Sequence, residues 1–350
     1  MVPGALLGID LDTFLTRARA METVCRTPRV ADNPGFSLGA LMAAGAANRR
    51  DKLTLLLPAR LQSLGLWIEQ LVAESTGKHG TGIVPIAGEP ADAEFGDDRV
   101  IVIVNVADQY PDRAVCDRAR ASGAPLVTLH MDDVLDLGAE FLRWEVATAA
   151  AGRLLSINPF DEPNVQQAKD ATRALLDVFR RERRLPLPEA HAEVGGVRLT
   201  MSEAAQAALT GTPATAFLDA ARAGDYIALL AFLPPEDPRF SAPLDSLRRA
   251  VSTRTGCATM FGYGPRYLHS TGQLHKGGAD NGVFIILTAE PDEDLAVPGE
   301  PFSFGVLESA QALGDFQSLD RAGRRALFVR APHRDPESIR RLADTLTGNR

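Results

Sequence analysis

Short apolar runs alternate with amphipathic stretches along most of this chain, and this alternation constrains its fold more than any other sequence feature. The runs rich in branched and aromatic residues are expected to be strands: residues 52–57, 100–106, 125–131, 226–233, 258–261, 283–289 and 326–330. Several are apolar almost throughout, as expected for strands buried on both faces of a parallel sheet. The pattern therefore predicts an α/β fold, with a doubly wound, mainly parallel sheet and helices on both faces.

Two regions interrupt the alternation. Residues 1–45 are rich in Ala and Leu at helical spacing, which predicts a helical N-terminal segment. Residues 46–350 are predicted to form the α/β domain, and residues from about 140 to 222 are predicted to be a helical insertion in it. In the last helix, Asp335 is expected to be the N-cap and Gly348 to follow the last turn.

The composition argues against several classes of protein. The 350 residues carry a formal net charge of −8, so no global positive field attracts nucleic acid, and the basic run 180–184 is interpreted as a solvated helix end. Cys25, Cys116 and Cys257 are far apart, which argues against a disulfide framework or a zinc site. The sequence has neither an apolar run of about 20 residues nor a signal-peptide pattern. We therefore expect a cytoplasmic protein that binds neither membrane nor nucleic acid.

A polar turn follows an amphipathic helix within residues 61–82. The helix is expected to run into the segment 74–78, Glu-Ser-Thr-Gly-Lys. A carboxylate at a helix end beside an apolar face is partly desolvated, which favours a role for Glu74 as a base. The alternative is that Glu74 merely ends a surface helix, with Gly77 as the helix stop. The turn does not fit a phosphate loop, because His79 stands where such a loop needs Ser or Thr.

A Gly-rich segment with two histidines, residues 261–278, follows the strand predicted at 258–261. Doubly wound sheets bind ligands at the ends of their strands. The six-residue spacing of the two histidines puts their imidazoles on different helix faces, so joint metal ligation is not expected. Tyr267 stands where a dinucleotide fingerprint needs its third Gly. The alternatives are structural histidines or a site for an anionic polyol, and the polar residues concerned are Arg266, His269, Gln273, His275 and Lys276.

Both segments resemble motifs of one enzyme family. Residues 74–78 are similar to the Glu-Ser-Asn-Gly-Lys segment of phosphoglucose isomerases, and residues 269–278 are similar to the second motif of that family. The likeness is greater still to the isomerase part of bifunctional transaldolase/phosphoglucose isomerase proteins. It extends over nearly the whole chain through further segments in the same order, at residues 50–55, 67–71, 158–165 and 310–315.

The resemblance implies a sugar-isomerase (SIS) type of fold and the interconversion of glucose 6-phosphate and fructose 6-phosphate through a cis-enediol. It assigns Glu74 as the base that moves a proton between C2 and C1, and His269 as the group that assists ring opening. It implies no metal and no cofactor. It also implies a set of substrate-binding side chains: Ser75, Thr76, Lys78, Arg266, Gln273, Lys276 and Gln311.

Two features of that family are absent from the sequence. The Gly-Gly-Arg-[Phe/Tyr]-Ser motif, whose arginine steadies the enediolate, does not occur. The family segment that carries a ring-opening lysine corresponds to residues 305–310, which contain no lysine, and Gln311 is the nearest polar residue that could face the sugar. We therefore expect the second half of a phosphoglucose isomerase, acting as a homodimer or with the missing N-terminal half. The alternative is a non-catalytic sugar-phosphate-binding or assembly module that needs such a partner.

Overall fold

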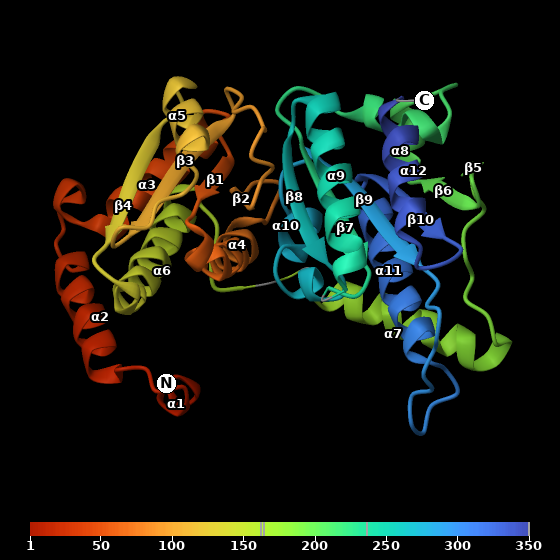
Figure 1. Cartoon of the computed structure of the whole chain (residues 1–350), viewed down its shortest axis with the longest axis horizontal. Coiled ribbons are helices and arrows are strands. Elements are labelled where there is room, and N and C mark those ends of the chain that lie inside the picture. Colours follow the sequence, from red (N-terminus) through yellow and green to blue (C-terminus); the bar gives the residue numbers. More distant parts are fainter. Residues whose placement is uncertain (162, 164, 236, 349–350) are drawn as a thin grey trace. The chain divides into compact units, whose positions relative to one another are not determined.

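The computed structural model describes residues 1–161, 163, 165–235 and 237–348, and the chain forms two compact units. One unit is Met1–Ala91 with Phe95–Asp161, and the other is Asp92–Glu94 with Glu162–Arg350. Each unit has its own sheet (Figure 1). This division differs from the single α/β domain predicted over residues 46–350, because the predicted strands are divided between two sheets. Glu162 and Asn164, at the start of a predicted helix, lie outside the described residues.

The first unit contains a sheet in the order β2-β1-β3-β4, and its neighbouring strands are parallel. The strands are β1 (Lys52–Leu56), β2 (Val84–Ala87), β3 (Arg99–Val106) and β4 (Leu126–Met131). The strands predicted at 52–57, 100–106 and 125–131 are confirmed. The apolar-run pattern does not predict β2, which is a short edge strand. Pro85 is compatible with that position, because an edge strand tolerates the loss of a ladder donor.

Helices cover both faces of the first sheet. The helices of this unit are α1 (Val2–Leu6), α2 (Leu11–Cys25), α3 (Pro34–Ala47), α4 (Gln62–Thr76), α5 (Arg113–Ala121) and α6 (Leu137–Leu154), with short 3-10 turns η1 (Val30–Asp32), η2 (Ala59–Leu61) and η3 (Val134–Asp136). Of these, α2 packs on α6. Apolar side chains of α3, α4 and α6 pack on β1 and β3 on one face. On the other face, Cys116 and Ala119 of α5 pack against Ile101 and Ile103 of β3.

The second unit contains a sheet in the order β5-β6-β10-β9-β7-β8. Its strands are β5 (Ala192–Val194), β6 (Val197–Met201), β7 (Tyr226–Phe232), β8 (Ala258–Tyr263), β9 (Gly282–Ala289) and β10 (Arg325–Ala331). The pairs from β8 to β10 are parallel, and β5 and β6 add an antiparallel hairpin beside β10. Both sheets are thus mainly parallel and flanked by helices, which confirms the predicted α/β class.

The region from about 140 to 222 is only partly helical. It contains the end of α6, then α7 (Val165–Glu182), α8 (Glu203–Ala208) and the 3-10 turn η4 (Ala214–Ala220), but β5 and β6 lie between α7 and α8. The prediction missed these strands because β6 alternates, with Arg198 exposed between buried Val197 and Leu199. A strand in which polar and apolar residues alternate lacks the continuous apolar run on which the strand prediction was based.

Helices also cover both faces of the second sheet. They are α9 (Pro238–Thr255), α10 (Gly272–Gly277), α11 (Phe304–Arg321) and α12 (Pro336–Thr347), with the 3-10 turn η5 (Arg266–His269). Apolar residues of α9 and α12 join one core cluster with the inward side chains of β7, β9 and β10. On the other face, α11 packs beside α7 and stacks Phe316 on Phe328 of β10, with ring centroids 5.3 Å apart. Asp335 caps α12 and Gly348 follows it in a left-handed conformation, as predicted.

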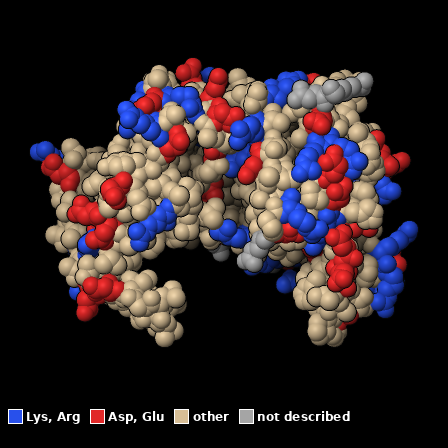
Figure 2. All heavy atoms as spheres, in the orientation of Figure 1, with Lys and Arg blue, Asp and Glu red and all other residues tan. Residues whose placement is uncertain are grey.

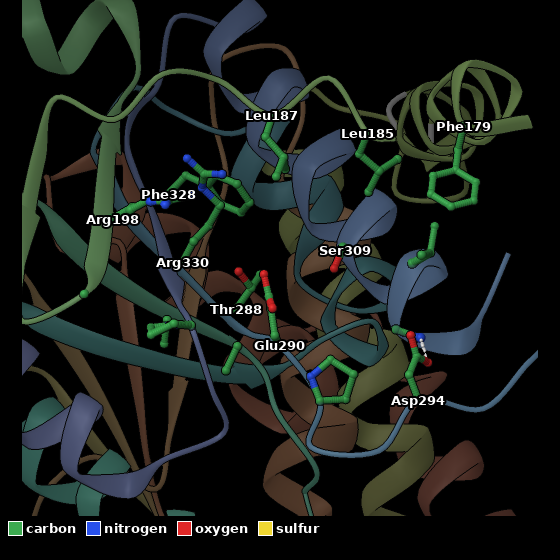
Figure 3. A pocket seen from close by; sticks show the side chains of 17 residues that line it. Phe179, Leu185, Leu187, Arg198, Thr288, Glu290, Asp294, Ser309, Phe328 and Arg330 are labelled. Atoms are coloured by element: carbon green, nitrogen blue, oxygen red, sulfur yellow. Dashed lines mark hydrogen bonds between the residues drawn. The ribbon is translucent and has the colours of Figure 1, made fainter. Parts of the chain in front are cut away.

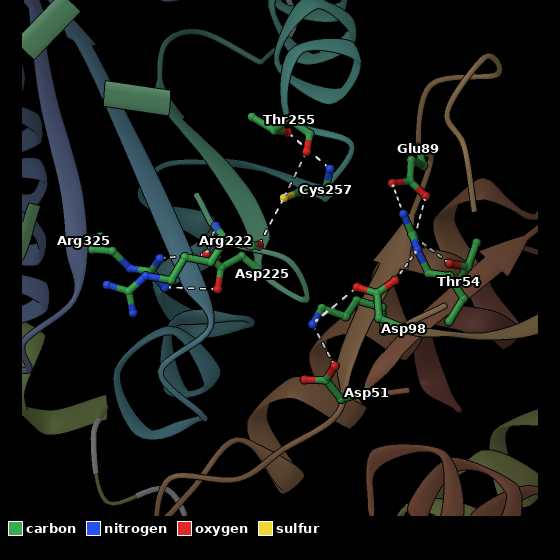
Figure 4. A network of polar contacts seen from close by, with 11 residues as sticks. Asp51, Thr54, Glu89, Asp98, Arg222, Asp225, Thr255, Cys257 and Arg325 are labelled. Carbon is green, nitrogen blue, oxygen red and sulfur yellow. Dashed lines mark hydrogen bonds and ion pairs between the residues drawn. The ribbon is translucent and has the colours of Figure 1, made fainter. Parts of the chain in front are cut away.

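The two ends of the sheets differ in chemistry. At the carboxyl ends of β9 and β10, a cavity of about 430 Å³ is open to ligands (Figure 3). At the amino ends, buried ion pairs close the sheets (Figure 4). In the first unit, Arg99 at the start of β3 pairs with Glu89 at 2.8 Å. In the second unit, Arg325 at the start of β10 pairs with Asp225 at 2.7 Å. Arg99 also donates to the hydroxyl of Thr54, and Arg325 also donates to the carbonyl oxygen of Ala220, so each guanidinium has a further partner inside the protein.

The surface carries mixed charge and an apolar N-terminal end. On the face shown in Figure 2, Lys and Arg side chains are interspersed with Asp and Glu side chains. Met1, Val2, Leu6 and Leu7 have between 63% and 83% of their area exposed.

Among the helices of the described residues, none combines the length and apolar character that crossing a bilayer requires. All three cysteines are free thiols.

Helices α3 and α6 approach closely at a glycine. A Cβ atom at Gly39 of α3 would lie 2.8 Å from the Cβ of Ala150 and would overlap the carbonyl oxygen of Ala147, both on α6. Backbone atoms of a packed helix cannot move aside cheaply, so Gly39 sets the spacing of the two helices.

Replacing Gly39 by valine is expected to lower the free energy of unfolding by about 1–3 kcal/mol, because the added atoms force the two helices apart. The matched control is Ala44→Val on the exposed face of the same helix, where the helix-propensity cost is at most about 0.7 kcal/mol. Urea unfolding followed by circular dichroism measures both. Equal effects of the two variants would contradict the close packing at Gly39.

Candidate functional site

Glu74 lies in the last turn of α4, and its side chain is half-buried. The helix forms because Leu64, Ile68 and Val72 recur on one face, which packs on the first sheet. Gln70 lies one turn earlier and donates from Nε2 to Oε2 of Glu74 at 3.4 Å. The packed face therefore fixes the backbone, while the carboxylate is kept at the boundary with solvent.

The turn after α4 is tied down by Thr76. Its hydroxyl donates to the carbonyl oxygen of Val72 at 2.7 Å and accepts from the amide of Ile83 at 3.0 Å. The helix ends before Gly77, as predicted. Ser75 is half-buried, whereas Thr76 is fully buried. The Thr76 hydroxyl thus links the end of α4 to the start of β2, which differs from the substrate contact expected from the sequence.

Lys78 has a similar structural environment. Its side chain is fully buried, and Nζ donates to the carbonyl oxygen of Asn158 at 2.7 Å, to Oδ1 of Asp161 at 2.8 Å and to the carbonyl oxygen of Asp161. The hydrogen bond from Lys78 holds the pKa of the Asp161 carboxyl below its ordinary value of 3.8. Lys78 therefore connects the Glu74 turn to residues 158–161. The resemblance had implied a substrate contact for Lys78, and these internal contacts are where the structure places its ammonium group.

His269 lies at the end of η5 and is exposed, and Arg266 at the start of the same turn is also exposed. The loop before η5 folds back tightly because it contains two glycines. A Cβ atom at Gly262 would lie 2.8 Å from the Cβ of Tyr267, and one at Gly264 would lie 2.6 Å from the ring of Phe232. Tyr267 and Leu268 are buried in this turn, whereas His269, the next residue, is exposed.

A cavity of about 230 Å³ brings His269 and Gln311 together. Gln311 comes from α11, and α7 adds Lys169, Thr172 and Arg173. The sequence prediction missed the α7 residues, although their spacing of three and four places them on one helix face. The cavity thus combines an imidazole, an amide, a hydroxyl and two cations, a set that can bind hydroxyl groups and an anion.

A buried polar cluster connects the two elements that provide His269 and Gln311. The hydroxyl of Tyr267 donates to Oδ2 of Asp315 at 2.7 Å, and Nζ of Lys276 lies 2.6 Å from Oδ1 of the same carboxylate. Tyr267 lies two residues before His269, and Asp315 lies one helical turn after Gln311. The cluster therefore holds η5 and α11 together. It also pairs Lys276 inside the protein, where the sequence suggested a cation that faces a ligand.

The second histidine of the motif has a different environment. His275 is buried among the rings of Tyr226, Tyr267 and Phe284. Burial, together with the charges of Lys276 and Arg324, holds its pKa well below the ordinary value of 6.5, so the ring is neutral at pH 7. Gln273 on the same helix is buried as well. Within the described residues, no group of three His, Cys, Asp or Glu side chains is arranged to hold a metal ion.

The predicted site residues are divided between the two units. Glu74, Ser75, Thr76 and Lys78 belong to the first unit, and Arg266, His269, Gln273, Lys276 and Gln311 belong to the second. Within the second unit, the structure brings His269 and Gln311 into one cavity and places Lys276 in the buried cluster with Asp315. Each group is therefore a separate candidate for chemistry: a carboxylate base in one unit and a polar cavity with an imidazole in the other.

Comparison with known proteins points to one enzyme family. A glucose-6-phosphate isomerase from Rubrobacter xylanophilus is 27% identical, with 50% of each chain covered. A probable glucose-6-phosphate isomerase from Methanococcus maripaludis is 24% identical, over 48% of this chain and 47% of that protein. The chain resembles the glucose-6-phosphate isomerases. This confirms the resemblance predicted from the separated motifs.

The likeness has clear limits. The chain spans about half the length of the curated glucose-6-phosphate isomerases it matches. No family model matches it. The crystal structure of a glucose-6-phosphate isomerase from Chlamydia trachomatis covers 96% of the chain, but the TM-score is 0.30 and the identity is 12%. That score is too low to support a shared overall fold.

The contact between Lys78 and Asp161 predicts a pH dependence of stability. Because the folded pKa of Asp161 is lowered, its ionised form stabilises the fold fully above pH 3.8, and this contribution is lost as the pH falls through the folded pKa. Asp161→Asn is thus expected to lower the urea midpoint at pH 6, and its difference from the parent should shrink toward pH 3. The control is Asp108→Asn on an exposed loop. A difference independent of pH would contradict this assignment.

Proposed function

We propose that this chain provides the base and the ring-opening group of a glucose-6-phosphate isomerase, which interconverts glucose 6-phosphate and fructose 6-phosphate. The proposal is carried by the half-buried Glu74 carboxylate at the end of α4, in a turn held by Lys78. It is supported by the sequence likeness to glucose-6-phosphate isomerases. We further propose a cytoplasmic location, which suits three free thiols.

Glu74 would act as the proton shuttle. In its ionised form it takes the proton from C2 of the open-chain aldose and leaves a cis-enediolate. The same carboxyl group then returns the proton at C1, so no net oxidant or reductant is needed. A base in this role must reach substrate without losing its orientation. The hydrogen bond from Gln70 and the anchored turn after Thr76 provide that orientation.

His269 would assist opening of the sugar ring by proton transfer at the ring oxygen. Its exposure leaves the imidazole accessible, and a histidine can both donate and accept a proton near pH 7. Gln311 in the same cavity would contact sugar hydroxyls. Lys169 and Arg173 would attract the phosphate, a role the sequence had suggested for Lys78 and Lys276.

The reaction also needs a donor for the developing enediolate charge. Removal of one such donor commonly costs a hundredfold or more, about 3 kcal/mol, in electrostatically stabilised reactions. We propose that a second copy of the chain or a domain with the Gly-Gly-Arg-Tyr-Ser motif supplies it. The exposed apolar residues Met1, Val2, Leu6 and Leu7 support such an association, because apolar surface of this kind favours a partner.

Glu74→Gln is expected to reduce isomerase activity by several powers of ten, because the amide has the shape of the carboxylate but is not a base. The measurement is a coupled assay of glucose 6-phosphate formation from fructose 6-phosphate, with the complementary domain supplied. Binding of sugar phosphate should change little. The matched control is Glu145→Gln on the exposed side of α6.

Two outcomes would contradict the proposal in different ways. Full activity of the Glu74→Gln protein would leave Glu74 as a structural helix end and the base elsewhere. No activity of the parent chain with the complementary domain, together with measurable sugar-phosphate binding, would favour the non-catalytic module.

His269→Ala is expected to slow turnover of cyclic glucose 6-phosphate by about a hundredfold, because one proton-transfer group is lost. Exchange of the C2 proton of the open-chain form, followed by NMR in deuterated water, should be affected far less. His333→Ala is the control, since His333 is exposed and lies outside the cavity. Equal losses in both measurements would argue against a ring-opening role.

A further inference from the structure

The cavity at the carboxyl ends of β9 and β10 is separate from the residues proposed for isomerisation. Its volume is about 430 Å³, within the usual range for small-molecule sites. None of the nine side chains predicted from the sequence lines it. Its walls come from β6, β9, β10, α11, α7 and the segment that follows α7, and Figure 3 shows their side chains. Ends of parallel strands are a common place for ligands in α/β folds, so this position fits a binding site.

Two arginines face each other on one wall of the cavity. Arg198 of β6 and Arg330 of β10 are Cα partners in the antiparallel pair, so their side chains project from the same face of the sheet. Like charges directly opposite each other destabilise a sheet. Burial, and next the charge of Arg198, lowers the pKa of Arg330. Arg198 also has Glu193 of β5 as its Cα partner on the other side, so the protein offsets part of the repulsion between the two guanidinium groups, and an anion bound between them would offset more.

Some N–H donors of Arg198 and Arg330 remain available to a ligand. Arg330 donates from Nη2 to the carbonyl oxygen of Pro188 at 2.9 Å, but its buried Nε has no hydrogen-bond partner among the described residues. Arg198 is exposed, and its Nε lies 3.4 Å from Oε2 of Glu193. Two guanidinium groups with free donors can bind an oxyanion through charge-assisted hydrogen bonds.

The acidic residues of the cavity limit the charge of the ligand. Asp294 is already occupied, since it accepts from the hydroxyl of Ser303 at 2.5 Å and the amide of Gly305 at 2.8 Å. Glu290 is exposed and projects into the space with Thr288 in Figure 3. Neutral donors leave Asp294 its charge, and Glu193 lies beside Arg198, so three carboxylates share the surroundings of the two arginines. A singly charged carboxylate ligand therefore meets less repulsion here than a dianionic phosphate would.

The opposite wall is apolar. Phe179, Leu185 and Leu187 lie together along one side of the cavity (Figure 3). Phe328 continues the apolar surface to the arginines, and the guanidinium of Arg330 lies 6.0 Å from the centre of its ring. Contact with an apolar ligand would remove this surface from water. The cavity therefore has a cationic end and an apolar side.

We propose that this cavity binds a small organic monocarboxylate, with its carboxylate between Arg198 and Arg330 and its apolar body against Phe179, Leu185 and Leu187. The site is independent of the proposed isomerase residues, and its occupancy does not require isomerase activity.

Phenylacetate is the probe, and saturation-transfer NMR on the full chain measures its binding. Ring protons should receive saturation, and the uncharged analogue 2-phenylethanol should bind at least tenfold more weakly because it lacks the carboxylate. Inorganic phosphate should not displace phenylacetate at equal concentration. Arg198→Gln should weaken binding at least tenfold and leave the melting temperature unchanged or higher, because it removes the like-charge contact. Arg340→Gln, on the exposed side of α12 and outside the cavity, is the matched control.

A second variant tests the apolar wall. Leu187→Asp places a negative charge beside the expected ligand at a position that is 47% exposed, so the fold should tolerate it, and binding should be lost. The proposal is overturned if phenylacetate fails to bind the parent chain at 10 mM, or if Arg198→Gln or Leu187→Asp binds it as well as the parent does. Displacement by phosphate at equal concentration would also overturn it.

Discussion

The central strands of the second sheet, β7, β9 and β10, are buried on both faces, and the rest of that unit is arranged around this burial. Removing apolar area from water stabilises a fold by about 25 cal/mol per Å², but every buried backbone group must also be hydrogen-bonded. A parallel sheet meets both requirements only when helices cover both faces. Ligands are then confined to strand ends and to the loops beyond them.

Because the faces of the sheets are covered, the amino and carboxyl ends of the strands are the places where the surroundings differ. At the amino ends, Arg99 and Arg325 are buried with carboxylate partners, and little room is left for a ligand. At the carboxyl ends of β9 and β10, the arginines are paired with each other across the strands and border an open cavity. The same residue type thus closes one edge, where its carboxylate partner is buried with it, and borders a candidate binding cavity at the other edge, where the carboxylate partner of Arg198 is exposed.

The anchored turns explain how loop residues can have defined positions. Lys78 and Asp161 hold the turn after Glu74, while Asp315 holds Tyr267 and Lys276 close to the His269 cavity. In each case a buried lysine has a carboxylate partner, and a shift of either segment would leave that buried cation without it. The two lysines that the motif pattern suggested as ligand contacts, Lys78 and Lys276, make these internal contacts. Sequence spacing could not distinguish these roles, because both need a lysine near a polar turn.

The sequence by itself determined the α/β class, the major strands, the end of α4 before Gly77 and the helix bounded by Asp335 and Gly348, because periodicity and capping are local properties. It also identified the likeness to glucose-6-phosphate isomerases through short motifs. Tertiary structure alone decided the division into two sheets, the strand β6 and the burial of Lys78. It also decided the meeting of His269 with Gln311 and α7. These depend on contacts between residues far apart in the chain, and no local pattern records which partner a side chain will meet.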